Sequence, residues 1–200
     1  MWQFLIKGGI IMIPLIFCSI LAVIIVVERI LFYSLRNRTP ERAFKQLKLV
    51  LNQGKLDEAK YLAATWRTPL GRITESVLGQ YQIDNTLIEE TAQSAGEREL
   101  RGLQRGLSLL DTVVTASPLL GLLGTVTGII KSFTALAVVS GSQASQLSAG
   151  IAEALYNTAF GLAIAIPALF FVNIFYGIAD KRARELTCQG QEILAILRKG

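Results

Sequence analysis

The sequence contains no histidine and only two cysteines, and these absences exclude several kinds of functional site. Without histidine there are no imidazole metal ligands, no Ser-His or Cys-His nucleophile pairs and no histidine proton relays. Cys18 lies in a long apolar run and Cys188 in a charged tail, so we expect free structural thiols and no disulfide. The remaining residues offer no combination of nucleophile, base and orienting group. The sequence therefore predicts neither an enzyme nor a bound cofactor.

Charged residues are also scarce, at 18% of the chain against 52% hydrophobic residues. The apolar residues are gathered in three runs, 9–31, 112–139 and 148–178, each longer than the ~20 residues that cross the hydrocarbon core of a membrane. The first run is too long for a signal peptide and ends in Glu28 and Arg29, so we expect a retained helix whose terminal charges reach water. The predicted fold class is an all-α membrane protein with three transmembrane helices. The second and third are expected to be long and extended into the cytoplasm, beside a small cytoplasmic helical segment.

Basic residues indicate how the chain is oriented. Thirteen of the 20 lie between Arg29 and Arg105 and five more in 181–199, whereas 140–146 has none. By the positive-inside rule the N-terminus is expected to be periplasmic and the C-terminus cytoplasmic. The net charge of +5 reflects this topology and contact with the lipid membrane, and without a compact basic patch no nucleic-acid partner is expected. We therefore divide the chain into an external N-terminus with the first transmembrane helix (1–35), a cytoplasmic helical segment (36–111), the second transmembrane helix (112–139), a short periplasmic loop (140–147), the third transmembrane helix (148–178) and a cytoplasmic C-terminal helix (179–200).

Turn signals and apolar spacing predict three short helices in the cytoplasmic segment, one starting at Thr39-Pro40 and the others at about 56–65 and 70–82. Asp84 or Asn85 is expected to cap a fourth helix. Because no proline follows until Pro118, this helix is predicted to run directly into the second span as one element. Glycines at 96, 102 and 106 oppose that continuity by roughly 1 kcal/mol each.

The second span, which includes ASPLLGLLGTVTGIIKSF, carries small and hydroxyl residues at helical spacing. At about 100° per residue, one sector of roughly 60° holds Gly121, Thr125, Gly128 and Ser132. Gly124 adds a GxxxG pair with Gly128, and such a face lets neighbouring helices approach closely. For this helix taken alone, the alternative to a functional site is a face that only packs against another transmembrane helix.

The third span places a carboxylate, an amide and a hydroxyl in its first third, at Glu153, Asn157 and Thr158. They lie on or beside a small-residue stripe that includes Gly150 and Gly161. An ionisable group inside a membrane segment costs on the order of 3 kcal/mol and marks a hypothetical ion or proton path. The candidate ion-pathway residues are therefore Thr125, Glu153, Asn157 and Thr158, and the five glycines at 121, 124, 128, 150 and 161 are candidates for helix packing.

Two prolines, Pro118 and Pro167, sit inside the second and third spans. Each removes one backbone donor and frees a carbonyl one turn earlier, so helix kinks are expected there. For the two threonines, the alternative to a role in an ion path is back-bonding to a carbonyl of the preceding turn.

Three stretches together resemble one known family. They are KGGIIMIPL with VVERI in the first span, SPLLGLLGTVTGIIKSF in the second and SAGIAEALYNTAFGLAIAIPALFFVN in the third. They are similar to the ExbB/TolQ proton-channel subunits and more distantly to the flagellar stator subunit MotA. The resemblance covers nearly the whole chain, and the order of spans deduced above is also that of this family.

The resemblance implies a homo-pentamer in the bacterial inner membrane whose second and third helices line a pore. It implies an ExbD/TolR-like single-span partner with a membrane aspartate, and a TonB-like or TolA-like protein that carries work to the outer membrane. Carried over by position, Thr125 and Thr158 would offer hydroxyls to the partner's aspartate or its water chain, and Glu153 would lie near the outer mouth. A TolQ-like role in envelope integrity and a purely structural membrane scaffold are the alternatives.

Lys131 departs from the family pattern, which more often has an uncharged or acidic residue there. By helical rise Lys131 lies about 12 Å below the outer end of its span, a depth similar to that of Glu153. We therefore expect an ion pair between Lys131 and Glu153 of the same or a neighbouring subunit, or else a lysine that snorkels to the outer interface.

Overall fold

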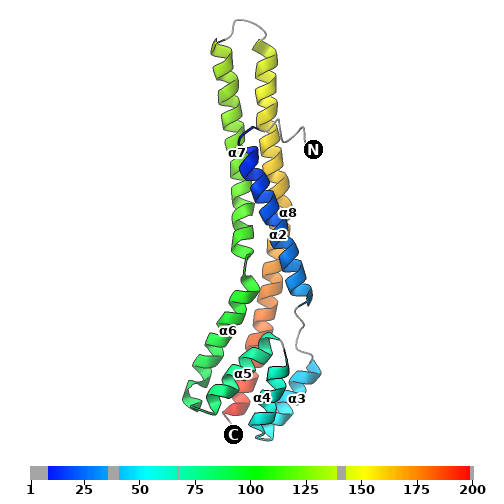
Figure 1. Ribbon diagram of the computed structural model, residues 1–200, viewed down its shortest axis with the longest axis vertical. Helices are drawn as coiled ribbons and strands as arrows, with labels where there is room; N and C mark the ends of the chain where they lie inside the picture. The colour runs from blue at the N-terminus through cyan, green and yellow to red at the C-terminus, as the bar shows by residue number, and fades with distance from the viewer. Residues whose placement is uncertain (1–8, 36–40, 67, 139–142, 199–200) are drawn as a thin grey trace. The chain divides into compact units, whose positions relative to one another are not determined.

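The computed structural model describes residues 9–35, 41–66, 68–138 and 143–198, and over these residues the chain is helical with short turns and no strand (Figure 1). The predicted helix start at Thr39-Pro40 and residues 140–142 of the predicted loop 140–147 lie outside the described residues. The elements in chain order are α2 (Met12–Leu35), α3 (Glu41–Asn52), α4 (Leu56–Thr65), α5 (Pro69–Tyr81), the 3-10 helix η1 (Asn85–Leu87), α6 (Ile88–Gln104), α7 (Leu107–Val138) and α8 (Gln143–Leu197).

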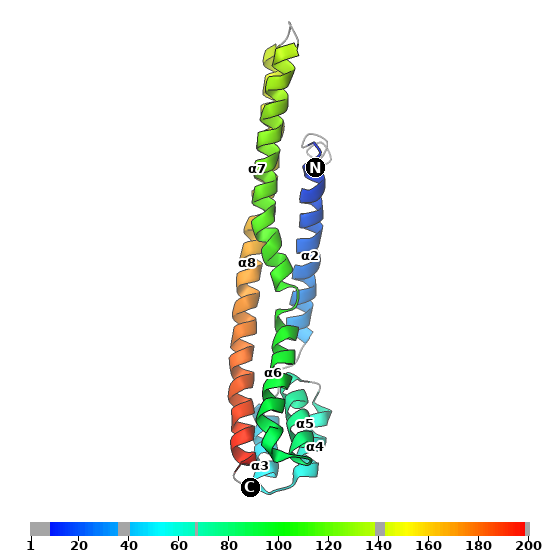
Figure 2. The same cartoon turned by 90° about the vertical axis from the view of Figure 1, so that its left-hand side faces the viewer.

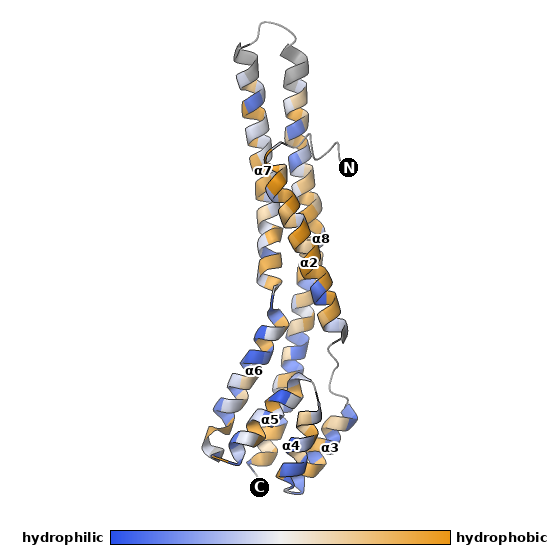
Figure 3. Ribbon diagram, viewed as in Figure 1, coloured by the Kyte–Doolittle hydropathy of each residue, from blue (hydrophilic) through white to orange (hydrophobic). Residues whose placement is uncertain are grey.

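Three stretches are long and apolar enough to cross a membrane, which confirms the predicted fold class. They are Met12–Ser34, Ile88–Thr134, which takes in α6 and α7, and Ser148–Leu197. Figure 3 shows the hydrophobic residues concentrated along α2, α7 and the first part of α8, with hydrophilic residues frequent on α6 and the last part of α8.

The chain divides into two compact units. Unit 1 contains Met1–Ile30 and Gly106–Phe175, and unit 2 contains Leu31–Arg105 and Tyr176–Gly200. In unit 1, α7 and the first part of α8 run antiparallel, side by side (Figures 1 and 2). α2 packs beside α8, where Ala22 and Ala168 line a shared groove.

Unit 2 is built on a buried apolar cluster from α3, α5 and the end of α8, which includes Leu47, Leu78 and Ile193. Ion pairs add to the edges of this core: Lys48 Nζ lies 2.7 Å from Glu192 Oε2. Because the end of α8 supplies part of the cluster, the last turns of α8 belong to the folded unit.

The start of α5 follows from its local sequence. Thr68 accepts a hydrogen bond from the Gly71 amide at 3.3 Å, and Pro69 occupies the first helical position, where a missing N–H costs nothing. The predicted helices at 56–65 and 70–82 are thereby confirmed, the first with the same bounds and the second shifted by one residue.

Asp84 caps the next element, the short helix η1. Its Oδ1 accepts hydrogen bonds from the Thr86 hydroxyl at 2.7 Å and the Thr86 amide at 2.9 Å. These bonds favour the charged carboxylate and lower the pKa of Asp84.

The prediction of one helix from Asp84 into the membrane is wrong at one point. α6 ends at Gln104, Gly106 has a φ of +77°, and α7 begins at Leu107. A glycine adopts this left-handed conformation without the steric cost that other residues meet, so Gly106 permits the break.

The opposite difference occurs in the third span. α8 is one helix of 55 residues that includes the predicted third span and most of the predicted C-terminal helix, and it starts at Gln143, inside the predicted loop 140–147. Pro118 and Pro167 both lie within continuous helices, so kinks at these residues remain a prediction.

Candidate functional site between α7 and α8

The part of the α7 and α8 contact around Gly121 and Gly161 brings the two backbones together. A β-carbon added at Gly121 would lie 2.9 Å from the Asn157 carbonyl oxygen and 3.0 Å from the Thr158 Cα. One added at Gly161 would lie 2.5 Å from the Ser117 carbonyl oxygen. Real β-carbons essentially never come this close, so these two positions require glycine for the observed packing.

The part of the contact around Gly128 and Gly150 is formed in the same way. Gly128 faces Ala154, whose β-carbon would lie 3.0 Å from an added β-carbon, and Gly150 packs against the Ser132 hydroxyl. Together with Gly124, the structure thus brings all five glycines singled out from the sequence into one interface. Close approach allows van der Waals and polar contacts that lipid cannot replace.

The two candidate threonines make different hydrogen bonds. The Thr158 hydroxyl donates to the Gly121 carbonyl of the facing helix at 3.1 Å. The Thr125 hydroxyl donates to the Leu122 carbonyl of its own helix at 2.6 Å, which is the back-bonding alternative. Because a hydroxyl has one proton and two lone pairs, both oxygens retain acceptor capacity in this arrangement.

Asn157 lies in the middle of the interface, and only 1% of it is exposed. Its β-carbon packs against Gly124, where an added β-carbon would lie 2.5 Å away. Within the described part of the chain, the Asn157 Oδ1 and the Ser117 Oγ are buried atoms with no hydrogen-bond partner. Such groups are costly in a dry interior, so they mark the polar centre of this packing face. Sequence reasoning missed Ser117, since a serine before a proline gives no signal of burial.

Lys131 and Glu153 are close in the same chain. The Lys131 Nζ lies 3.6 Å from the Glu153 Oε1, with 62% of the lysine side chain and 27% of the glutamate side chain exposed. The segment before α2 meets this pair, because a side chain at Gly9, which has a φ of +65°, would collide with the Glu153 carboxylate. Three separate parts of unit 1 therefore meet at this ion pair.

Arg29 differs from its expected position. The prediction that it reaches water is wrong, because only 1% of the residue is exposed. Its Nε and Nη2 donate to the two carboxylate oxygens of Glu28 at 2.6 and 2.5 Å. This bidentate arrangement is the geometry in which a guanidinium is best tolerated away from water.

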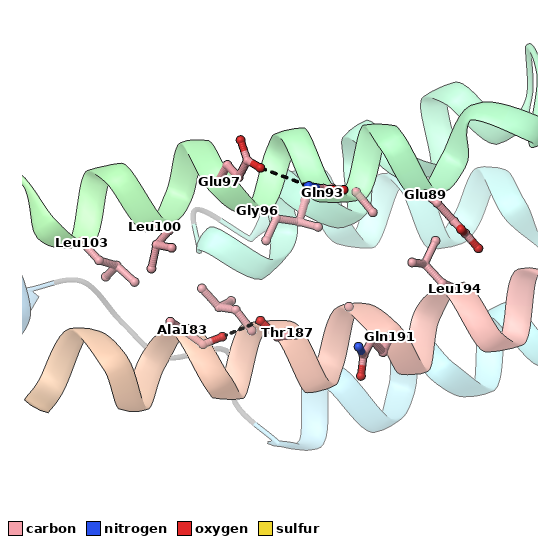
Figure 4. Close-up of a pocket in the computed structure, with 14 residues that line it drawn as sticks. Glu89, Gln93, Gly96, Glu97, Leu100, Leu103, Ala183, Thr187, Gln191 and Leu194 are labelled. Carbon is pink, nitrogen blue, oxygen red and sulfur yellow. Dashed lines mark hydrogen bonds between the residues drawn. The ribbon is translucent and has the colours of Figure 1, made fainter.

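A groove of about 380 Å³ lies in unit 2 between α6 and the last part of α8 (Figure 4). Leu100, Leu103 and Leu194 are among its apolar lining residues, and Gln93 donates to Glu97 at 3.2 Å along one wall. Among the described residues no group of three potential metal ligands occurs, here or elsewhere.

Comparison with known proteins assigns the chain to a family. The model of the MotA/TolQ/ExbB proton channel family matches residues 65–187. The chain is 34% identical to the biopolymer transport protein ExbB-like 3 of Synechocystis sp., over 84% of this chain and 81% of that protein.

Two further relatives carry the ExbB and TolQ names. Identity to the biopolymer transport protein ExbB of Salmonella typhimurium is 32%, over 68% of this chain and 61% of that protein. Identity to the Tol-Pal system protein TolQ of Pseudomonas aeruginosa is 40%, over 51% of this chain and 44% of that protein. With three membrane-length apolar helices and a match over more than half its length, the chain belongs to the MotA/TolQ/ExbB proton channel family.

Proposed function

We propose that this chain is the inner-membrane subunit of a motor or channel driven by the proton-motive force, which energises a TonB-like or TolA-like protein acting at the outer membrane. Membership of a proton channel family and the biopolymer transport relatives support this role. The distribution of basic residues supports a periplasmic N-terminus and a cytoplasmic C-terminus.

The active form in this proposal is a homo-pentamer in which α7 and α8 line a central pore. Its three apolar runs contain no aspartate, and their two glutamates, Glu28 and Glu153, each lie against a basic side chain, so in this proposal the chain does not supply the carboxyl group that is titrated. That group would come from an ExbD/TolR-like single-span protein seated in the pore.

The observation that carries the mechanism is the hydrogen bond from Thr158 to the Gly121 carbonyl. It uses the only proton of the hydroxyl, and Thr125 uses its own proton in the same way. The remaining lone pairs can accept a hydrogen bond from a protonated carboxylic acid but cannot donate to a carboxylate. Contact with the partner's aspartate would therefore be favourable when that aspartate is protonated and lost when it ionises.

Glu153 has a secondary place in this proposal. Its partner Lys131 offsets the charge of the carboxylate, so Glu153 acts as an electrostatic and structural element near the outer mouth. The Asn157 Oδ1, one of the two buried oxygens without a hydrogen-bond partner among the described residues of this interface, would accept a hydrogen bond from water in the ion path.

The test is co-expression of the chain with an ExbD/TolR-like protein from the same genome, followed by native mass spectrometry and proton flux in proteoliposomes. Thr158→Val should leave the pentamer and its partner intact and lower the flux about tenfold, the effect of one hydrogen bond. Thr158→Ser should retain the flux. Thr134→Val is the matched control, because that exposed hydroxyl only bonds back to the Ile130 carbonyl.

A structural scaffold is the second candidate, favoured by the buried amide of Asn157, which can specify how two helices pair. A stable oligomer that retains no single-span partner, with flux unchanged in Thr158→Val, would support the scaffold and refute the motor. The identity of the co-purified partner would separate TonB-dependent nutrient import from a TolQ-like role in envelope integrity, which the TolQ relative supports.

A further inference from the structure

The turn that precedes α2 is held in place by a backbone hydrogen bond and by burial. The Gly9 carbonyl accepts from the Met12 amide at 3.2 Å. Met12 and Leu15 are both buried, so one side of the first turn of α2 packs inside unit 1, to which Gly9 also belongs. The position of the Gly9 backbone is therefore fixed by neighbours on its own segment.

This backbone lies directly against a carboxylate of α8. A β-carbon added at Gly9 would collide with the Glu153 Oε1 and would lie 3.7 Å from the Lys131 Nζ of α7. The Oε1 itself lies 3.6 Å from this Nζ, so the added carbon would take the place of the carboxylate oxygen beside the ammonium group. Gly9 also has a left-handed φ of +65°, which a glycine adopts without strain.

Two positive groups consequently face one carboxylate. Lys131 supplies a full charge from α7, and the start of α2 supplies the partial positive charge of a helix N-terminus. Only 27% of the Glu153 side chain is exposed, and partly buried charges are screened less than exposed ones. The carboxylate of α8 thus has favourable interactions with two other segments of unit 1.

We infer that Glu153 docks the start of α2 on the pair formed by α7 and α8, and that Gly9 is a positioning residue that keeps the Glu153 carboxylate beside Lys131. The alternative is an ion pair between α7 and α8 alone, in which α2 has no part. The inference does not rest on the proposed function, because all three residues lie in unit 1 of one chain and the tests need neither a partner protein nor ion flux.

Crosslinking with a water-soluble carbodiimide tests the position of the carboxylate in the protein purified in detergent. The reagent joins a carboxyl group to an amine in contact with it, with loss of one water, and mass spectrometry reads the fraction of peptide linked through Lys131 and Glu153. The pair of Lys48 and Glu192, at 2.7 Å, shows that the reagent has reacted. Gly9→Ala should lower the linked fraction about threefold, the population effect of losing a partly exposed ion pair.

Gly54→Ala is the matched control for this experiment. Gly54 has a similar φ of +74°, but an added β-carbon there meets nothing within 4 Å. The control therefore imposes the same kind of backbone strain without a collision, and it should leave the linked fraction unchanged. A linked fraction in Gly9→Ala that is no lower than in Gly54→Ala would overturn the positioning role.

Hydrogen exchange at the start of α2 tests the docking role and does not depend on a substitution at Gly9. Glu153→Gln keeps the shape of the side chain and removes its charge, so the first turn should fray and the Met12 amide should exchange about threefold faster. Glu192→Gln, which removes the carboxylate of the ion pair with Lys48, should leave exchange at Met12 unchanged. Equal exchange in Glu153→Gln and the wild type would overturn the docking role.

A double-mutant cycle of unfolding separates docking from mere proximity. In a Glu153→Ala background the collision at Gly9 disappears, and Gly9→Ala costs only its backbone strain. Gly9→Ala should therefore raise the equilibrium constant of unfolding about threefold more in the wild type than in Glu153→Ala, within the range for residues in contact. Additive effects would show that the start of α2 and the ion pair are independent, and would overturn the inference.

Discussion

The close contact between α7 and α8 makes Gly161→Ala the sharpest prediction of this structure. An alanine β-carbon at this position would lie 2.5 Å from the Ser117 carbonyl oxygen and 3.3 Å from the Gly121 Cα, both of them backbone atoms that no rotamer change can move. Ordinary contact begins at 3.4 Å, so the helices would have to separate by about 1 Å. Overpacking of this kind costs about 1–3 kcal/mol.

The separation would also stretch the hydrogen bond from Thr158 to the Gly121 carbonyl, which is already 3.1 Å long. Loss of an interhelical hydrogen bond in a membrane protein adds about 0.6 kcal/mol. Since alanine also gains about 1 kcal/mol of helix propensity over glycine, we expect Gly161→Ala to lower the free energy of unfolding by about 1–3 kcal/mol in total.

The assay is unfolding of the purified protein in mixed micelles of mild detergent and SDS, followed by circular dichroism. Gly177→Ala is the matched control on the same helix, because an added β-carbon there meets nothing within 4 Å. Helix propensity predicts that this control is neutral or up to about 1 kcal/mol more stable than the wild type. Ordinary surface substitutions change the free energy of unfolding by about 0.5 kcal/mol or less. If the free energies of unfolding of Gly161→Ala and Gly177→Ala differ by no more than about that amount, the close approach of the two helices is refuted.

Two further predictions concern charged groups. Lys131→Gln and Glu153→Gln should show a coupling of about 0.5 kcal/mol in a double-mutant cycle of unfolding, since the pair is partly exposed; additive effects would rule out the ion pair. Asp84→Ala should lower thermal stability at pH 7. Hydrogen bonds from Thr86 lower the pKa of the Asp84 carboxylate in the folded state. The contribution of these bonds to folding stability is therefore fully present above the ordinary pKa of 3.8 and is lost as the pH falls through the lowered pKa of the folded state. Thermal melts of the wild type and Asp84→Ala between about pH 7 and about pH 2 check this pH dependence. A difference in melting temperature that stays the same at every pH would contradict it.

Much of the fold could be predicted from local pattern. Apolar run length determined the three spans, and the 3.6-residue period put the packing glycines of each span on one face. The sequence also distinguished the short helices near 56–65 and 70–82, because a threonine and a proline mark the start of the second one. These features depend only on residues within a few turns of one another.

The glycines and hydroxyl residues that the sequence singled out lie together in the structure, but their hydrogen bonds and the burial of Ser117 were not predictable. Thr125 and Thr158 look alike in the sequence, yet one bonds to its own helix and the other to the facing helix. The difference arises because only Thr158 meets a facing carbonyl, that of Gly121, whose lack of a side chain brings it within reach. Spacing along one helix contains no information about the register of its neighbour.

By itself, the sequence determined the all-α membrane class, the three spans and the small-residue faces, since length and period are properties of a single segment. Only the tertiary structure decided that Arg29 is buried, that Lys131 pairs with Glu153 of the same chain, and that the helix predicted to continue is broken at Gly106. The burial of Arg29 and the pairing of Lys131 with Glu153 depend on groups far away in sequence. At Gly106 the residue type permits the left-handed φ of +77°, but a glycine inside a continuous helix costs only about 1 kcal/mol, so local spacing does not predict the break.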